Sequence, residues 1–216
     1  MSEPTRAALT EPTRAAVTEQ PAVPPHIVDA ARHVLAQDGL AAATLERISA
    51  AAGVSRMTLH RRGVSKDDIL RAIATQLEHD YRVAMWPALV SRGTGAQRLR
   101  DALEHLCGVT ERNLLLLSAL SASSRDAIYH ETGPGALTRK VFVEPLERLL
   151  IDGAADGTLA AVDAEETATV LFNAVGHTYV HLRGGHGWSP KRARVGVLRL
   201  VIDGLTARDS AAPPEG

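Results

Sequence analysis

The amino-acid sequence predicts an all-α fold of about nine helices, and three observations support this prediction. Aromatic residues make up only 3% of the chain, so the core must be built from Leu, Val, Ile and Ala. Alanine is abundant and β-branched runs are rare, which favours helix over strand. Apolar residues also recur at helical spacing between glycine, proline and capping residues. The short run VFV at 141–143 lies inside such a pattern, so we expect no strand.

The first three helices are short and follow one another closely. The proline pair at 24–25 suits the first turn of a helix. Gly39 is expected to end that helix as a left-handed cap. Thr44 is the N-cap candidate of the second helix, which Gly53 terminates, and Ser55 caps the third.

The fourth helix is longer and begins with a strong signal. Ser65 is its N-cap, and Asp68, three residues on, completes a capping box. We expect this helix to run from 66 towards Met85, because Pro87 limits or kinks it. The linkers that follow place five further helices at about 95–107, 111–128, 135–152, 163–183 and 189–207.

Both ends of the chain are predicted to be flexible tails. Residues 1–23 hold a tandem octapeptide, EPTRAALT then EPTRAAVT, which is too short for a solenoid. An alternative is an arm that tracks DNA phosphates through Arg6 and Arg14, but each copy also carries an offsetting glutamate. The second tail is expected at 209–216.

Composition narrows the class of protein. The formal net charge is −1, so attraction to nucleic acid must come from a local patch. The single cysteine excludes an intramolecular disulfide and argues against zinc. We see no signal peptide, no membrane-spanning run, no nucleophile motif and no phosphate-binding loop. We therefore expect a cytoplasmic protein that is not an enzyme and carries no cofactor.

Residues 44–62, TLERISAAAGVSRMTLHRR, have the features of a helix-turn-helix. Such a motif needs a small residue where the helices touch and a turn residue that accepts positive φ. Ser49 and Gly53 meet these needs. The buried contacts are expected from Ile48, Ala52, Val54 and Leu59.

The helix that follows Ser55 is predicted to present its charge outward. Leu59 points to the core, and the opposite half can enter a major groove, where arginine forks onto guanine. Lys66, at the start of the next helix, is expected on a phosphate. The candidate DNA contacts are Thr44, Ser55, Arg56, Met57, Thr58, His60, Arg61, Arg62 and Lys66. The alternative is a solvated basic helix, which leaves the spacing of the turn and core residues unexplained.

The stretch TLERISAAAGVSRMTLHRRGVSKDDIL closely resembles the signature of TetR-type transcriptional regulators. The resemblance covers about 26–70, and the matching positions are Thr44, Ile48, Ala51, Gly53, Val54, Ser55, Thr58, Leu59, Ser65, Lys66 and Leu70. It implies a DNA-binding domain at 24–70 and an effector-binding and dimerisation domain at 71–208. It also implies a ligand-responsive repressor that binds a palindromic double-stranded operator as a homodimer.

Four positions depart from the family pattern. His60 replaces the usual tyrosine, Met57 a glycine or proline, and Arg62 a histidine. Gly63 replaces an aromatic residue, and the loss of that ring is expected to weaken local packing unless a neighbour fills the space. These departures motivate an alternative function, a ligand- or partner-binding helical protein whose helix-turn-helix no longer binds DNA.

The resemblance implies dimerisation through the last two long helices. Their apolar stripes give the predicted interface residues Ala168, Leu171, Val175, Tyr179, Leu198, Ile202 and Leu205. Two such helices from each chain would form a four-helix interface. The alternative is that both stripes face the core of their own subunit.

A pocket for an unknown, largely hydrophobic effector is also implied. Its candidate lining residues are Met85, Trp86, Leu103, Cys107, Leu117, Phe142, Leu146 and His177. Plain core packing is the alternative for the first seven. His177 and His181 share a helical face and resemble a metal pair, with His105 or His186 as a third ligand. An interface histidine pair or polar pocket lining is the alternative to metal binding by His177 and His181. No carboxylate stands at ligand spacing, so we predict no metal site.

Overall fold

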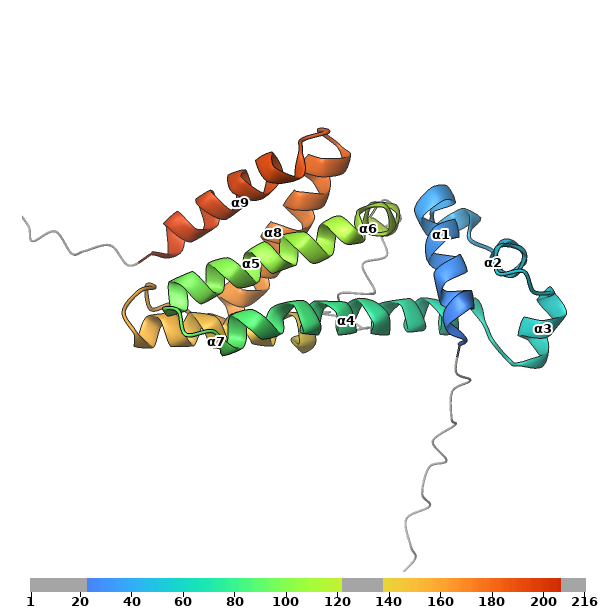
Figure 1. Ribbon diagram of the computed structural model, residues 1–216, viewed down its shortest axis with the longest axis horizontal. Helices are drawn as coiled ribbons and strands as arrows, with labels where there is room; N and C mark the ends of the chain where they lie inside the picture. Colours follow the sequence, from blue (N-terminus) through green and yellow to red (C-terminus); the bar gives the residue numbers. More distant parts are fainter. Residues whose placement is uncertain (1–22, 122–137, 207–216) are drawn as a thin grey trace, which may run out of the picture.

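The computed structural model of the chain describes residues 23–121 and 138–206, and within these ranges it contains nine helices (Figure 1). They are α1 Pro25–Ala42, α2 Leu45–Ala51, α3 Arg56–Arg61, α4 Lys66–Val90, α5 Gly95–Arg112, α6 Leu114–Ser121, α7 Lys140–Ala155, α8 Ala164–Gly184 and α9 Pro190–Leu205. The described part has no strand beyond isolated bridges. The predicted all-α fold is confirmed. The octapeptide repeat and the C-terminal tail lie outside the described residues.

Two hydrophobic cores organise the helices. The smaller core joins α1, α2, α3 and the first half of α4 with three leucines of α6, namely Leu116, Leu117 and Leu120. The larger core joins the second half of α4 with α5, α7, α8 and α9. Helix α4 extends from the smaller core into the larger one and contributes to both (Figure 1). Helix α4 is therefore shared by the two cores.

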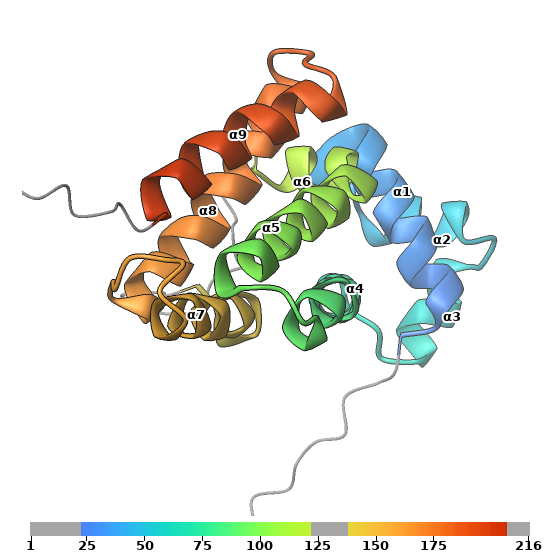
Figure 2. The ribbon, with the colours of Figure 1, turned by 60° about the vertical axis from the view of Figure 1, so that its left-hand side comes forward.

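Helix α5 lies at the centre of the larger core, between α4, α7, α8 and α9 (Figure 2). Leu99 and Leu103 are completely buried. At its start α5 crosses α7 so closely that a Cβ on Gly95 would collide with the backbone of Gly153. At its end Glu111 accepts hydrogen bonds from the guanidinium of Arg183 at 2.7 and 2.8 Å, which ties α5 to the end of α8.

The junction between α5 and α6 falls at a different place from the prediction. Helix α5 continues past 107 to Arg112, and α6 begins at Leu114. The break is Asn113, with φ −111°, whose side-chain amide donates to Val109 O at 2.9 Å. Its Oδ1 accepts from Arg32 of α1, so this buried asparagine also fastens the smaller core to α5.

Two helix ends also differ from expectation. Helix α4 does not stop near Met85 but passes through Pro87 to Val90. The guanidinium of Arg98 donates to the carbonyls of Ala88 and Leu89 at 3.1 and 2.6 Å, so the end of the helix remains hydrogen-bonded. Gly39 has the expected positive φ, +78°, but a further turn follows it within α1.

The apolar stripes of α8 and α9 face the core of their own subunit. Six of the seven residues expected at the dimer interface are buried in the larger core, and the seventh, Leu205, packs against it half-buried. The six are Ala168, Leu171, Val175, Tyr179, Leu198 and Ile202. For these side chains the structure favours packing within their own subunit, because contacts inside the same chain already cover them.

Candidate DNA-binding site and interior cavity

The tripeptide Gly-Val-Ser occurs twice, at 53–55 and at 63–65, and forms the same structure each time. The glycines have φ +67° and +65°, values that a residue with a side chain rarely adopts. The following valine N–H groups donate to Ser49 O at 3.0 Å and Leu59 O at 3.1 Å, the bond that closes a Schellman motif. The same turn therefore ends α2 and α3, so that α3 lies between two identical turns.

The serine of each tripeptide starts the next helix. Ser55 Oγ accepts from Thr58 N–H at 3.1 Å, and Ser65 Oγ accepts from Asp68 N–H at 3.1 Å. Asp68 returns the bond by accepting from Ser65 N–H at 2.8 Å, so the predicted capping box is present. These bonds fix the residues at which α3 and α4 begin.

The position of Gly63 corrects the expectation of a packing defect. A Cβ placed on Gly63 meets no atom within 4 Å, so this position faces open space. Val64, the next residue, is 4% exposed and belongs to the smaller core beside Leu59. The valine of the turn thus supplies the buried group, and the glycine supplies the backbone conformation.

The outward face of α3 is polar, basic and exposed. Leu59 is 1% exposed and packs in the smaller core, whereas Met57 is 64% exposed. The four remaining side chains predicted on this face, Arg56, His60, Arg61 and Arg62, are all exposed. Thr58 is half-buried. The short helix and its C-cap residue Arg62 therefore present three guanidinium groups and an imidazole at the surface.

The flanking candidates are engaged within the protein. Thr44 Oγ1 accepts from Arg47 N–H at 3.3 Å as the N-cap of α2. Lys66 Nζ donates to Leu40 O at 2.8 Å, which joins the start of α4 to the end of α1. A phosphate contact from either residue stays a prediction, and for Lys66 it requires the ammonium to share or leave this bond.

Residues 27–73 match the sequence profile described as "Bacterial regulatory proteins, tetR family". This segment is similar to the tetR family of regulators. The match agrees with the predicted resemblance, and the family is one of bacterial regulatory proteins. The match lies on the segment, 26–70, whose resemblance implied DNA binding and transcriptional regulation. No curated protein matches the chain.

Solved structures of tetR-family regulators show the same fold over most of this chain. A TetR/AcrR-family regulator from Thermobifida fusca is 23% identical, with 82% of this chain and 95% of that chain covered and a TM-score of 0.60. A TetR-like regulator from Rhodococcus sp. RHA1 is 22% identical, with 83% and 93% covered and a TM-score of 0.57. The ketosteroid regulator KstR2 of Mycobacterium tuberculosis is 15% identical, with 84% and 94% covered and a TM-score of 0.62.

An interior cavity of about 40 Å³ lies where the two cores meet. Its walls come from α4, α5, α6, α7 and α8. Three predicted pocket residues, Leu117, Phe142 and His177, line it. Tyr81 and Phe172 line it as well and are not among the residues predicted from the sequence. The small number of aromatic residues in the chain is a signal that could have identified these two buried rings.

The other predicted pocket residues lie elsewhere. Leu103, Cys107 and Leu146 are buried in the larger core and do not line the cavity. Met85 and Trp86 line a separate surface groove between α4 and α7. Met85 is buried at the base of this groove, and Trp86 is 63% exposed.

The cavity walls are largely apolar, and their polar groups are mostly occupied. Tyr81 Oη donates to Phe142 O at 2.7 Å, and burial raises the pKa of this phenol, so it stays neutral. Thr110 Oγ1 donates to Leu106 O at 2.8 Å. An apolar occupant fits such walls better than a charged one.

The histidines considered for metal binding do not form a group of three ligands in the described residues. The His181 ring stands edge-on to His186 with centroids 4.8 Å apart, and His177 lines both the cavity and a surface hollow that it shares with His181. Over 23–121 and 138–206, no three His, Cys, Asp or Glu side chains are grouped to share a metal ion. No helix in these ranges is long and apolar enough to cross a membrane.

Proposed function

We propose that the chain is a ligand-responsive repressor that binds a palindromic operator in double-stranded DNA as a homodimer. The observation that carries this proposal is the exposed basic face of α3, held between two identical glycine turns. A helix fixed at both ends can offer its side chains to base edges without first ordering its backbone. Because its partner is operator DNA, we place its action in the cytoplasm.

One copy of α3 is too short to read an operator alone. Six residues span about 9 Å, so a second α3 one turn of DNA away, about 34 Å, is needed to read a second half-site. The outward sides of α8 and α9 carry three exposed aliphatic residues, Val170, Val195 and Leu200, and Leu200 is 79% exposed. We propose this outer surface, instead of the buried stripes, as the dimer interface.

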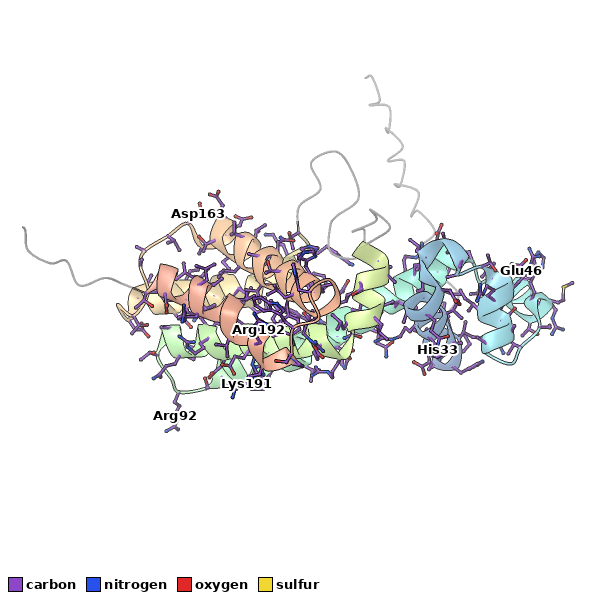
Figure 3. All side chains as sticks on the ribbon, turned by 90° about the horizontal axis from the view of Figure 1, so that it is seen from above. His33, Glu46, Arg92, Asp163, Lys191 and Arg192 are labelled. Atoms are coloured by element: carbon purple, nitrogen blue, oxygen red, sulfur yellow. The ribbon has the colours of Figure 1, made fainter. Side chains whose placement is uncertain are left out.

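Charge supports that interface. The acidic residues Glu165 and Glu166 lie at the start of α8, and Lys191 and Arg192 at the start of α9, at opposite ends of this antiparallel pair. Figure 3 shows the two ends, marked by Asp163 and by Lys191 and Arg192. A two-fold axis across the pair would bring the basic end of one copy against the acidic end of the other.

The cavity gives a route from an effector to α3. It is far smaller than the roughly 300 Å³ of a usual ligand pocket, so an effector must push the surrounding helices apart. Leu77 of α4 and Leu117 of α6 line the cavity and also belong to the smaller core. An expanded cavity would therefore move the DNA-binding helices of each subunit. Effector and operator would then oppose each other's binding.

Selection of duplexes from a random-sequence library by the full chain tests the function. We expect enrichment of a two-fold-symmetric motif whose half-site centres are about 10 base pairs apart. A single asymmetric half-site would contradict the dimer, since only two related copies impose symmetry. Absence of any enriched motif would favour the alternative, a helical ligand-binding protein with a helix-turn-helix that does not bind DNA.

A further inference from the structure

One acidic side chain interrupts the basic surface around α3. Between Thr44 and Lys66 the chain has five arginines and lysines, and Glu46 is its only acid. Glu46 lies in the first turn of α2 at the far end of the molecule (Figure 3). Its Oε1 is 2.5 Å from Nη1 of Arg56, the first residue of α3. The pair therefore links the start of α2 to the start of the proposed reading helix.

A carboxylate in this place opposes DNA binding if it acts by charge alone. The pKa of Glu46 is lowered, first by a hydrogen bond from its own backbone N–H and also by the nearby guanidinium of Arg56, so it stays ionised at neutral pH. An ionised carboxylate repels the phosphates that the surrounding cations attract. The side chain of Glu46 is 54% exposed, so it does not contribute to the hydrophobic core.

The carboxylate of Glu46 lies where it can restrict the conformation of the Arg56 side chain. A free arginine at the start of α3 has many rotamers, and most of the negative charge within its reach on DNA belongs to phosphates. The contact with Glu46 occupies Nη1 and leaves Nη2 and Nε, two donors on one edge of the guanidinium. N-terminal residues of a reading helix are those that meet base edges.

We propose that Glu46 is a specificity-determining residue, which holds Arg56 away from the phosphates and directs its free edge towards a guanine in the major groove. The inference rests on the proposed operator binding. It makes Glu46 a positioning residue, because it acts on DNA through Arg56. Loss of the carboxylate then strengthens binding to arbitrary DNA and weakens discrimination for the operator.

The expected changes are modest because both side chains are exposed. Exposed ion pairs are weak, and the discrimination ratio should fall by about two- to five-fold when the pair is broken. Release of Arg56 adds one phosphate contact on arbitrary DNA, so the salt slope there should steepen by about 0.9. A matched control is available in Asp38, whose Oδ2 is 2.6 Å from Nη2 of Arg47, an exposed pair away from α3.

The test compares full-length Glu46→Gln, Asp38→Asn, Arg56→Ala and the Glu46→Gln/Arg56→Ala double variant. Fluorescence anisotropy measures their affinities for a duplex selected by the wild type and for a scrambled duplex, at several salt concentrations. We expect Glu46→Gln to bind scrambled DNA more tightly and to discriminate less, Asp38→Asn to discriminate as the wild type does, and Glu46→Gln to have no effect on discrimination once Arg56 is absent.

Two outcomes would overturn the inference. Glu46→Gln could strengthen binding to both duplexes equally, which is the result for a merely repulsive charge. Glu46→Gln could also lower discrimination as much without Arg56 as with it, which would exclude action through that arginine. Failure of the proposed function looks different, because the wild type itself would then select no duplex.

Discussion

Replacement of Gly63 by alanine should destabilise the protein although the added methyl group meets no atom. The backbone of Gly63 has φ +65°, and an L-residue pays about 1–2 kcal/mol to adopt this conformation. Alanine also lowers the conformational entropy of the unfolded chain, which stabilises the folded state by about 0.4–1 kcal/mol. Because the new Cβ meets open space, packing contributes nothing to the change in the free energy of unfolding. We therefore expect the free energy of unfolding to fall by about 1 kcal/mol.

Gly176 provides the matched control. It lies inside α8 beside the cavity, has helical geometry, and a Cβ there also meets nothing within 4 Å. Alanine is the better helix former, so Gly176→Ala should raise the free energy of unfolding by about 0.5–1 kcal/mol. Urea unfolding followed by circular dichroism, at one fixed protein concentration, measures both variants. Equal effects of one sign would refute the argument that Gly63 is required for its backbone conformation.

Three further predictions concern the interface, pH and the thiol. Leu200→Glu should convert the dimer to a monomer in sedimentation, whereas Ile151→Glu, another exposed aliphatic position on α7, should leave it dimeric; a dimeric Leu200→Glu variant would move the interface elsewhere. The pKa of Glu111 is lowered by hydrogen bonds from Arg183 and then Tyr179. The stability that Glu111 contributes to the folded state is therefore present above the ordinary glutamate pKa of about 4.3 and is lost as the pH falls towards the lowered pKa. Glu111→Gln should therefore be less stable than the wild type at pH 7 and should flatten the acid limb of a urea-midpoint profile; an unchanged profile would contradict this. Burial raises the pKa of Cys107 to about 12, so the native thiol should not react with a disulfide reagent at pH 8 but should react in urea, and rapid native labelling would contradict the buried position.

The local features of the DNA-binding region could be predicted from the sequence because its signals act over a few residues. Ser55, Ser65 and Asp68 bond to backbone groups three residues away, and Gly53 and Gly63 set the conformation of their own peptide units. Such signals need no knowledge of the rest of the fold. The helix-turn-helix and the outward face of α3 therefore followed directly from the printed residues.

The predictions for the larger core were weaker because they depended on distant partners. Apolar periodicity shows that α8 and α9 each bury a face, but not whether a second copy or the same subunit covers it. Pro87 weakens a helix by itself, yet Arg98, eleven residues on, hydrogen-bonds the carbonyls that follow it. The cavity combines five helices, so no single segment could identify Tyr81 or Phe172 as its walls.

The central claim is that the exposed face of α3 reads an operator. The most direct measurement is the ratio of the affinities for the selected and the scrambled duplex at one salt concentration, for the wild type and for Arg61→Ala. We predict a ratio of at least about 10³ for the wild type and a clear reduction for Arg61→Ala, with an unchanged unfolding midpoint. A wild-type ratio near one, or a ratio that Arg61→Ala leaves unaltered, would contradict the claim.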